Sequence, residues 1–293
     1  MKVFITGASG FVGNVVAEHL LAAGHDVVAL ARSDEAAARV ERVGAEVVRG
    51  SLADLDLLRE TAAGADAVAH VAVDFTEPEM RQLEEPALDA LLGALDGGRS
   101  FVYASTAMVY PDTAAGAATE GDDLDPDSPQ LFKALGERQV LEAPGVTGTV
   151  LRASLVYGRG GSALLQGMIG ASKAFGAAPY VGEGTNLWST IHVEDLARLY
   201  VAALENRVGG VFNASSRTQL RTRELAEAIS RLTTADTQPL TEEQGTEAFG
   251  PFYVILGREI TLDPTRAEET FSWEPKEVGL LDDIATGSYR ALA

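Results

Sequence analysis

A glycine-rich segment near the start of the sequence constrains the fold more than any other feature. A short apolar run precedes it, a helical pattern follows it, and it reads Thr6-Gly7-Ala8-Ser9-Gly10-Phe11-Val12-Gly13. With this spacing, the first glycine permits a tight turn, the second lets the backbone approach a pyrophosphate, and the third allows close packing of helix on strand. The helix N-terminus offers free N–H groups and a partial positive charge to phosphate. We therefore interpret the segment as a dinucleotide-binding loop rather than a purely structural turn, with contacts expected from Gly7, Ser9, Gly10, Phe11, Val12 and Gly13.

Short β-branched runs alternate regularly with helical patterns through the first half of the chain. The expected strands are Val3–Thr6, Val27–Ala31, Glu46–Arg49, Ala67–Val73 and Phe101–Ser105. The expected helices are Asn14–Ala23, Asp34–Val43, Asp54–Ala63 and Glu79–Leu95. A glycine follows each of the first three helices, as expected for a C-cap. The alternation predicts an α/β fold, a Rossmann-type doubly wound parallel sheet with helices on both faces.

The second half of the chain is less regular. After a polar loop, the predicted elements are helix Phe132–Glu142, strand Thr147–Ala153, and helices Val193–Glu205 and Arg221–Leu232. We expect a dinucleotide-binding domain over residues 1–157. Residues 158–293 should form a smaller C-terminal lobe that mainly binds substrate, with a segment at about 188–215 returning to the first domain.

The end of the second strand discriminates between NAD and NADP. An NAD site usually places a carboxylate there, ~20 residues after the glycines, to bind the ribose 2′-hydroxyl. The chain instead reads Leu30-Ala31-Arg32-Ser33. Arg32 and Ser33 suit a 2′-phosphate because they offer a guanidinium fork and a hydroxyl donor. The alternative is that Arg32 is a solvated surface residue and Asp34 binds the ribose. We predict that NADP(H) is preferred over NAD(H).

Charge and composition exclude several kinds of function. The 293-residue chain has 43 acidic and 23 basic residues and a net charge of -20, whereas nucleic acids and anionic membranes attract cationic surfaces. The absence of cysteine excludes disulfides, thiolate nucleophiles and cysteine zinc sites, and the four histidines lack metal-ligand spacing. No signal peptide or membrane-spanning run is visible. We expect a cytoplasmic protein with a small-molecule substrate, no metal, no nucleic-acid partner and no membrane partner.

Together the motifs resemble those of the extended and atypical short-chain dehydrogenase/reductase family, the NAD(P)-dependent epimerases and dehydratases. The likeness covers nearly the whole chain. Besides the glycine loop, it rests on His70-Val71-Ala72, Ser105-Thr106-Ala107-Met108-Val109-Tyr110, Arg152–Gly158 and Ile191-His192-Val193-Glu194-Asp195. Where the family often has Gly-Asp-Leu after the third strand, this chain has Gly50-Ser51-Leu52. The resemblance implies cofactor contacts from Ser51, Leu52, Val71, Ala72, Val73 and Lys133.

The sequence departs from the family's catalytic pattern, Tyr-x-x-x-Lys followed by a glutamate on the same helix. Lys133 and Glu137 match its second half, but Pro129 stands at the tyrosine position, and residues 112–155 contain no tyrosine. In the family, the tyrosine exchanges a proton with the substrate oxygen, while the lysine lowers its pKa and holds the ribose. Such proton transfer contributes ~10²–10⁴ in rate. The resemblance therefore implies an atypical active site.

Three residues are the candidates for catalysis: Thr106, Lys133 and Tyr157. Thr106 occupies the family's hydroxyl position and can hydrogen-bond a carbonyl oxygen, although its pKa is too high to replace a phenol. Lys133 could bind the ribose hydroxyls or act through a water. Tyr157 follows a strand whose carboxyl end should face the cleft. It is the best substitute for the missing phenol by position, the alternative being a packed turn residue.

The substrate is expected to contact Asp74, Thr106, Trp188 and His192. Asp74 follows the fourth strand and could act as a base, or it could be a solvated turn carboxylate. Trp188 and His192 could line the substrate lobe or serve only in packing.

These residues support three hypotheses. The leading one is an NADP(H)-dependent oxidoreductase that acts on a small carbonyl or alcohol substrate. The alternatives are a redox-neutral isomerase, lyase or cyclase on the same fold, and a non-catalytic NADP(H)-binding regulatory module. Many members of the family dimerise through two helices in a four-helix bundle. The resemblance therefore implies a homodimer through Glu79–Leu95 and Phe132–Glu142.

Overall fold

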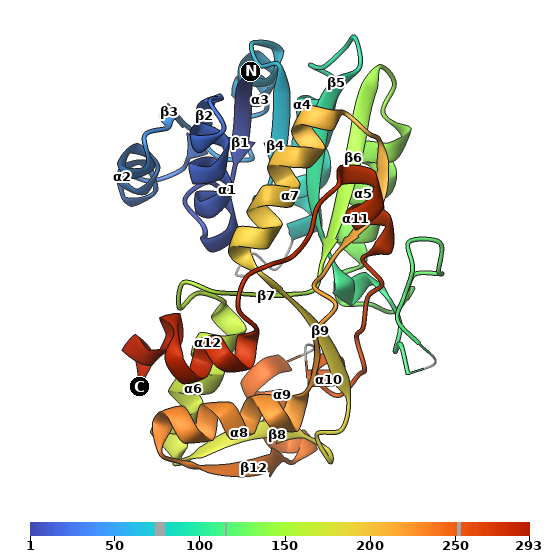
Figure 1. Cartoon of the computed structure of the whole chain (residues 1–293). Helices are drawn as coiled ribbons and strands as arrows, with labels where there is room; N and C mark the ends of the chain where they lie inside the picture. Colours follow the sequence, from blue (N-terminus) through green and yellow to red (C-terminus); the bar gives the residue numbers. More distant parts are fainter. Residues whose placement is uncertain (74–79, 115, 251–252) are drawn as a thin grey trace.

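The computed structural model describes residues 1–73, 80–114, 116–250 and 253–293 and is built around a seven-stranded sheet (Figure 1). Its strand order is β10-β6-β5-β4-β1-β2-β3, and every neighbouring pair is parallel. The strands are β1 (Lys2–Thr6), β2 (Asp26–Ala31), β3 (Glu46–Arg49), β4 (Ala67–His70), β5 (Arg99–Thr106), β6 (Val146–Ala153) and β10 (Gly210–Ala214). The predicted Rossmann-type α/β fold is confirmed.

Helices cover both faces of this sheet. One face carries α1 (Phe11–Ala22), α2 (Asp34–Val43), α7 (Val193–Asn206) and α11 (Thr265–Phe271), and the other carries α3 (Leu55–Ala63), α4 (Met80–Leu92) and α5 (Leu131–Glu142). Successive residues of β1 alternate between the layers, with Val3 and Ile5 in the first core and Phe4 in the second. Burial on both faces explains why the strands are continuous apolar runs.

The fourth strand is shorter than the sequence predicts. The expectation was Ala67–Val73, but β4 ends at His70. The Val71 amide bonds to the Thr6 carbonyl at 3.2 Å, and the chain then crosses over the glycine loop. A Cβ on Gly7 would lie only 2.6 Å from the Ala72 nitrogen. The apolar character of residues 71–73 therefore reflects packing over this loop rather than continued strand pairing.

A second lobe lies below the large sheet in Figure 1. It contains a three-stranded sheet in the order β11-β9-β7 and a two-stranded sheet, β12-β8. These strands are β7 (Leu155–Tyr157), β8 (Ala177–Val181), β9 (Leu187–His192), β11 (Gln219–Arg221) and β12 (Asp236–Leu240). The helices are α6 (Ala163–Phe175), α8 (Thr222–Thr233), α9 (Glu242–Phe249), α10 (Tyr253–Leu256), α12 (Leu280–Thr286) and the 3-10 helix η3 (Ser288–Leu292).

The chain passes between the two parts several times. After β9 it returns to the large sheet as α7 and β10, enters the lobe again, and comes back as α11 before α12. Phe271 packs edge-to-face on Phe212 of β10 with ring centroids 4.7 Å apart, and Trp273 joins the same core. Residues near the C-terminus thus complete one face of the N-terminal sheet.

Two glycines with the same backbone conformation allow the close approach at the glycine loop to be tested. Gly7 and Gly24 have φ of +81° and +82°, but a Cβ at Gly24 meets nothing within 4 Å. We expect Gly24→Ala to lower the free energy of unfolding by about 1–2 kcal/mol, the cost of a left-handed alanine. Gly7→Ala should cost about 3 kcal/mol or more, because its methyl group must also displace backbone. Urea denaturation without cofactor measures both, and equal losses would contradict the close approach.

Candidate active site

The glycine loop has the geometry of a phosphate site. The Gly10 amide donates to the Gly7 carbonyl at 2.9 Å, and a Cβ on Gly13 would lie 2.2 Å from the Gly7 oxygen. Helix α1 can therefore begin directly against β1. Gly10 is its N-cap, and no side chain caps the helix. The first-turn N–H groups fit a pyrophosphate, which is the ligand such a helix end favours.

The other predicted residues of this loop lie around it. Ser9 is half-buried, and its carbonyl accepts from Arg39 of α2 at 3.4 Å. Phe11 packs on Gly161, where a Cβ would lie 2.1 Å from its ring. Val12 packs against the core beneath α1. Phe11 therefore joins the glycine loop to the turn between β7 and α6 of the lobe.

A cation from β3 lies beside the end of β2, and the sequence did not indicate it. Ser33 is the N-cap of α2, because its Oγ accepts from the Ala36 amide at 3.1 Å. Arg49, the register partner of Ala31, donates to the Ser33 carbonyl and pairs with Asp34 at 2.6 Å. Exposed Arg32 precedes this turn. The Asp34 carboxylate is thus engaged by Arg49, while the Ser33 hydroxyl proton remains available to a phosphate.

The cofactor contacts that the resemblance implies after the third and fourth strands are ordered by local bonds. The Ser51 amide and hydroxyl both donate to the Asp54 carboxylate, at 2.7 and 2.9 Å. Leu52 is buried in the core under α3. Ala72 donates its amide to the Thr6 hydroxyl at 3.4 Å, and Val71 is buried beside it, with half-buried Val73 following. These residues lie after β3 and β4, at the carboxyl edge of the sheet where dinucleotides bind.

Thr106 and Lys133 occupy different environments. Thr106 ends β5, and its Oγ1 accepts from the Met108 amide at 3.2 Å, which leaves the hydroxyl proton free to donate to a substrate oxygen. Lys133 lies in the first turn of α5 and is 4% exposed. Its ammonium donates to Glu84 Oε1 of α4 at 2.6 Å. Lys133 is therefore held between two helices by a carboxylate that the family motifs did not indicate.

The predicted residues of the lobe make internal contacts. The Tyr157 hydroxyl donates to the Val278 carbonyl at 2.7 Å, and burial raises the pKa of this phenol. The Tyr157 ring meets His192 edge-to-face at 5.1 Å, and His192 Nδ1 accepts from the Glu194 amide at 3.2 Å. Trp188 donates its indole N–H to the Arg258 carbonyl at 3.0 Å. Asp74 lies outside the described residues.

A buried polar network joins β5, α5 and β6 beneath the predicted site. Ser105 and Arg152 both donate to Glu137, and the Arg152 guanidinium reaches one carboxylate oxygen at 2.6 Å. Arg152 also donates to the Tyr110 hydroxyl at 2.7 Å, and that hydroxyl donates to Asn213 at 2.9 Å. Burial opposes the charge of Arg152, but Glu137 nevertheless raises its pKa. The network fixes the carboxyl ends of these strands. Arg152 and Glu137, which match family motifs, are thus part of this structural network.

The periodicity of the sequence indicates that the Glu84 side chain is buried. Met80, Glu84, Leu88 and Leu91 recur at helical spacing and are all buried in α4, so the glutamate occupies a core position of an amphipathic helix. The role of Arg49 could not be predicted from the sequence, because it depends on the register between β2 and β3.

Within the described part of the chain, no cluster of three or more histidine, aspartate or glutamate side chains could hold a metal ion. No described helix is both long and apolar enough to cross a bilayer.

Known proteins resemble the chain along its length. The sequence profile of the NAD dependent epimerase/dehydratase family matches residues 3–215. An uncharacterized protein of Saccharomyces cerevisiae is 32% identical over 295 residues, which span 97% of this chain and 98% of that protein. The 4-hydroxy-2-methyl-3-oxo-4-farnesyl-3,4-dihydroquinoline-1-oxide ketoreductase of Stigmatella aurantiaca is 32% identical over 226 residues. This alignment covers 72% of this chain and 66% of the ketoreductase. The crystal structure of a Bacillus cereus UDP-glucuronic acid 4-epimerase with UDP-glucuronic acid and NAD has a TM-score of 0.79 at 22% identity and 99% coverage of both chains.

Proposed function

The chain belongs to the NAD dependent epimerase/dehydratase family, and we propose that it is an NADP(H)-dependent oxidoreductase acting on a small carbonyl or alcohol substrate. The observation that carries the proposal is the Thr106 hydroxyl at the carboxyl end of β5, beside β4 in the sheet that bears the glycine loop. Its free proton suits a carbonyl oxygen. The ketoreductase relative supports a carbonyl substrate. A redox-neutral reaction is the second candidate, because the fold is also that of a sugar-nucleotide 4-epimerase.

We assign cofactor binding to residues 1–157 and mainly substrate binding to 158–293, with the segment at about 188–215 returning to the first part. The glycine loop and the uncapped N-terminus of α1 would hold the pyrophosphate. Arg32 and the Ser33 hydroxyl, next to Arg49, would hold a 2′-phosphate. Trp188 and His192 lie in the lobe assigned to substrate, and Asp74 remains a prediction there. A cytoplasmic location also remains a prediction.

The roles of the catalytic residues follow from their contacts. NADPH, when bound, supplies the hydride. Thr106 donates a hydrogen bond that strengthens as negative charge develops on the substrate oxygen. Lys133 binds the ribose hydroxyls or orders a water that delivers the proton. Tyr157 could deliver the proton only by releasing the Val278 carbonyl, and burial, which raises the pKa of its phenol, makes it a weaker acid than a free tyrosine.

Turnover assays separate the three functions. With a panel of small ketones and aldehydes, an oxidoreductase consumes NADPH in proportion to product, measured by the near-ultraviolet absorbance of the reduced nicotinamide. Substrate conversion without net cofactor change would replace this proposal with the redox-neutral one. Bound cofactor without turnover of any substrate would favour the regulatory module.

Cofactor choice depends on Arg32. We expect NADPH to bind more tightly than NADH, and Arg32→Ala to weaken NADPH binding by about 1.5–3 kcal/mol with little effect on NADH, the range for hydrogen bonds to charged groups. Calorimetric titration measures both affinities. Arg42→Ala is the matched control, because Arg42 is exposed in the last turn of α2, the helix that follows Arg32. Equal or tighter NADH binding by the wild type would refute the NADP assignment.

Two substitutions locate the proton donor. Thr106→Val should lower kcat while leaving NADPH affinity nearly unchanged, because it removes a bond that matters most in the transition state. Tyr157→Phe should lower kcat by ~10² or more if its phenol is the general acid. Single-turnover kinetics under saturating cofactor provide the measurement. If neither substitution lowers kcat, both residues are rejected in these roles. Asp74, His192 or a group on the substrate would then be tested as the proton donor.

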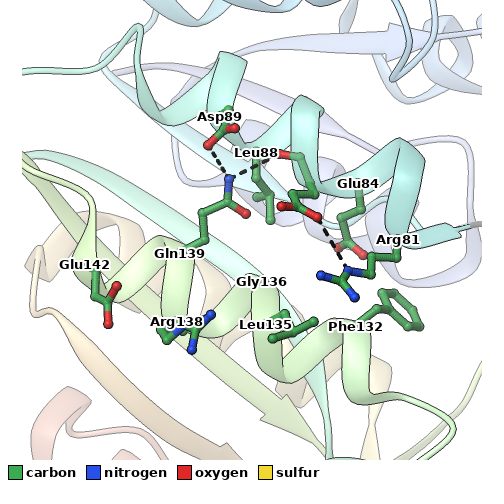
Figure 2. A pocket seen from close by; sticks show the side chains of 11 residues that line it. Arg81, Glu84, Leu88, Asp89, Phe132, Leu135, Gly136, Arg138, Gln139 and Glu142 are labelled. Carbon is green, nitrogen blue, oxygen red and sulfur yellow. Dashed lines mark hydrogen bonds and ion pairs between the residues drawn. The ribbon is translucent and has the colours of Figure 1, made fainter.

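We also propose a homodimer through α4 and α5. A groove runs between these helices on their outer side, where Gln139 bonds to Asp89 at 2.5 Å and Arg81 pairs with Glu85 (Figure 2). Leu131 and Leu141 of α5 are 40% and 43% exposed. Such apolar exposure is suited to a helix–helix interface.

Leu141→Glu should convert the dimer to a monomer, since it introduces a charge into that interface. Phe175→Glu on α6, where the wild-type ring is 84% exposed, is the control and should leave the mass unchanged. Analytical ultracentrifugation measures the mass of each protein in solution. A monomeric wild type would refute the proposed dimer.

A further inference from the structure

Three buried groups converge on one carboxylate oxygen beneath the predicted site. Glu84 Oε1 accepts from the Lys133 ammonium at 2.6 Å and from the Tyr103 hydroxyl at 2.7 Å. His70 Nε2 lies 3.7 Å from the same atom. The four residues come from α4, α5, β5 and β4, and none is more than 4% exposed. Figure 2 shows Glu84 on the side of α4 that faces α5.

The surrounding structure is shaped for this arrangement. Gly136 lies in the middle of α5, a position where glycine costs helix stability. A Cβ there would lie 2.3 Å from the Tyr103 hydroxyl, so only glycine lets that hydroxyl stand between the helices and reach Glu84. On the other side, the His70 ring is fixed by a 2.9 Å bond to Thr6 and by stacking on Tyr103 at 5.9 Å.

Stability alone does not account for the cluster. Within the described part of the chain, Glu84 Oε2 and His70 Nε2 are buried without a hydrogen-bond partner, and each such atom carries a desolvation cost. A buried ion pair is often no more stable than apolar residues of the same volume. What the carboxylate does provide is a fixed position and a retained charge for Lys133. Burial lowers the pKa of Lys133, and Glu84 is the principal group that opposes this.

We propose that Glu84 is a positioning residue for the reaction. Its carboxylate keeps the Lys133 ammonium charged in a buried site and aligns it for the cofactor ribose, with Tyr103 holding the carboxylate in place. The inference rests on the ribose-binding role proposed above for Lys133. Glu84 itself is buried at the helix interface and acts through Lys133.

The titration behaviour of the cluster follows from the groups that face it. Lys133 lowers the pKa of Glu84 to about 2 against the effect of burial, so the carboxylate is ionised at neutral pH. Burial lowers the pKa of His70 and raises that of Tyr103, so both are neutral there. Glu137, further along α5, adds to the negative field at Lys133. Lys133 is therefore the group whose charge changes when Glu84 is neutralised.

The test is the pH dependence of NADPH binding without substrate. In Glu84→Gln, the Lys133 pKa is no longer supported by a carboxylate, so the NADPH affinity should begin to fall at a lower pH than in wild type. In the pH range where only the variant has lost the ammonium charge, its Kd should be roughly tenfold weaker than that of wild type. Glu60→Gln is the matched control, since Glu60 is an exposed glutamate on α3, away from the α4–α5 interface, and its profile should equal that of wild type. Nicotinamide fluorescence provides the Kd.

Lys133→Met, alone and combined with Glu84→Gln, separates the positioning role of Glu84 from the ribose-binding role of Lys133. Lys133→Met should bind NADPH weakly and without this pH dependence, and adding Glu84→Gln should change nothing further. A wild-type profile in Glu84→Gln, with weakened binding in Lys133→Met, would overturn the role of Glu84 alone. Wild-type binding by Lys133→Met would overturn the ribose role of Lys133 and the present inference with it.

A shorter carboxylate keeps the proposal testable if Glu84→Gln does not fold. Glu84→Asp retains the charge but withdraws it from Lys133 by one methylene. Its pH profile should match that of wild type while Kd rises several-fold at every pH, since the ammonium is charged but misplaced. A wild-type Kd in Glu84→Asp would overturn the positioning role.

Discussion

The contact of the Gly7 backbone with the chain that leaves β4 sets the geometry on which the site depends. Because no Cβ separates them, residues 71 and 72 cross directly over the glycine loop. This crossing ends β4 at His70, while the close approach of Gly13 to the Gly7 carbonyl places the start of α1 against β1. The Thr6 hydroxyl secures the crossing, since it bonds both the His70 ring and the Ala72 amide. The glycine loop and the buried cluster at Glu84 are thus linked through the Thr6 side chain.

The sequence predicted six of the seven strands of the large sheet, because each of these six lies next to a helix along the chain; it did not predict β10, which joins the sheet from residues 210–214. The runs around Val27 and Phe101 alternate with helices that end at glycine, and the inner strands β1, β4 and β5 are buried on both faces. The error at Ala67–Val73 has the same origin, since the apolar pattern continues after the pairing has ended. The apolar pattern reports burial, and residues 71 and 72 pack against Gly7 of the glycine loop after strand pairing has ended.

The site was less predictable, because its contacts join residues that are distant in sequence. Arg49 reaches Ser33 only through the register of β2 and β3. Lys133 meets Glu84 only through the packing of α4 on α5. Family motifs indicated Lys133 as a ribose ligand, but they carried no information about the residue that binds it. The strand pairings of the lobe, such as β7 with β9, likewise bring together segments about 35 residues apart.

The repeated passage of the chain between its two parts has a consequence for how the protein is made. The seventh strand, β10, and the aromatic residues that cover it come from residues 210–214 and 271–273. During synthesis, the emerging sheet therefore lacks an edge strand until residue 214 has left the ribosome, and part of one covering layer until residue 273 has done so. An exposed sheet edge and an open apolar face favour association with other chains. The early product should thus depend on chaperones, although most of its sheet is already encoded in the first 153 residues.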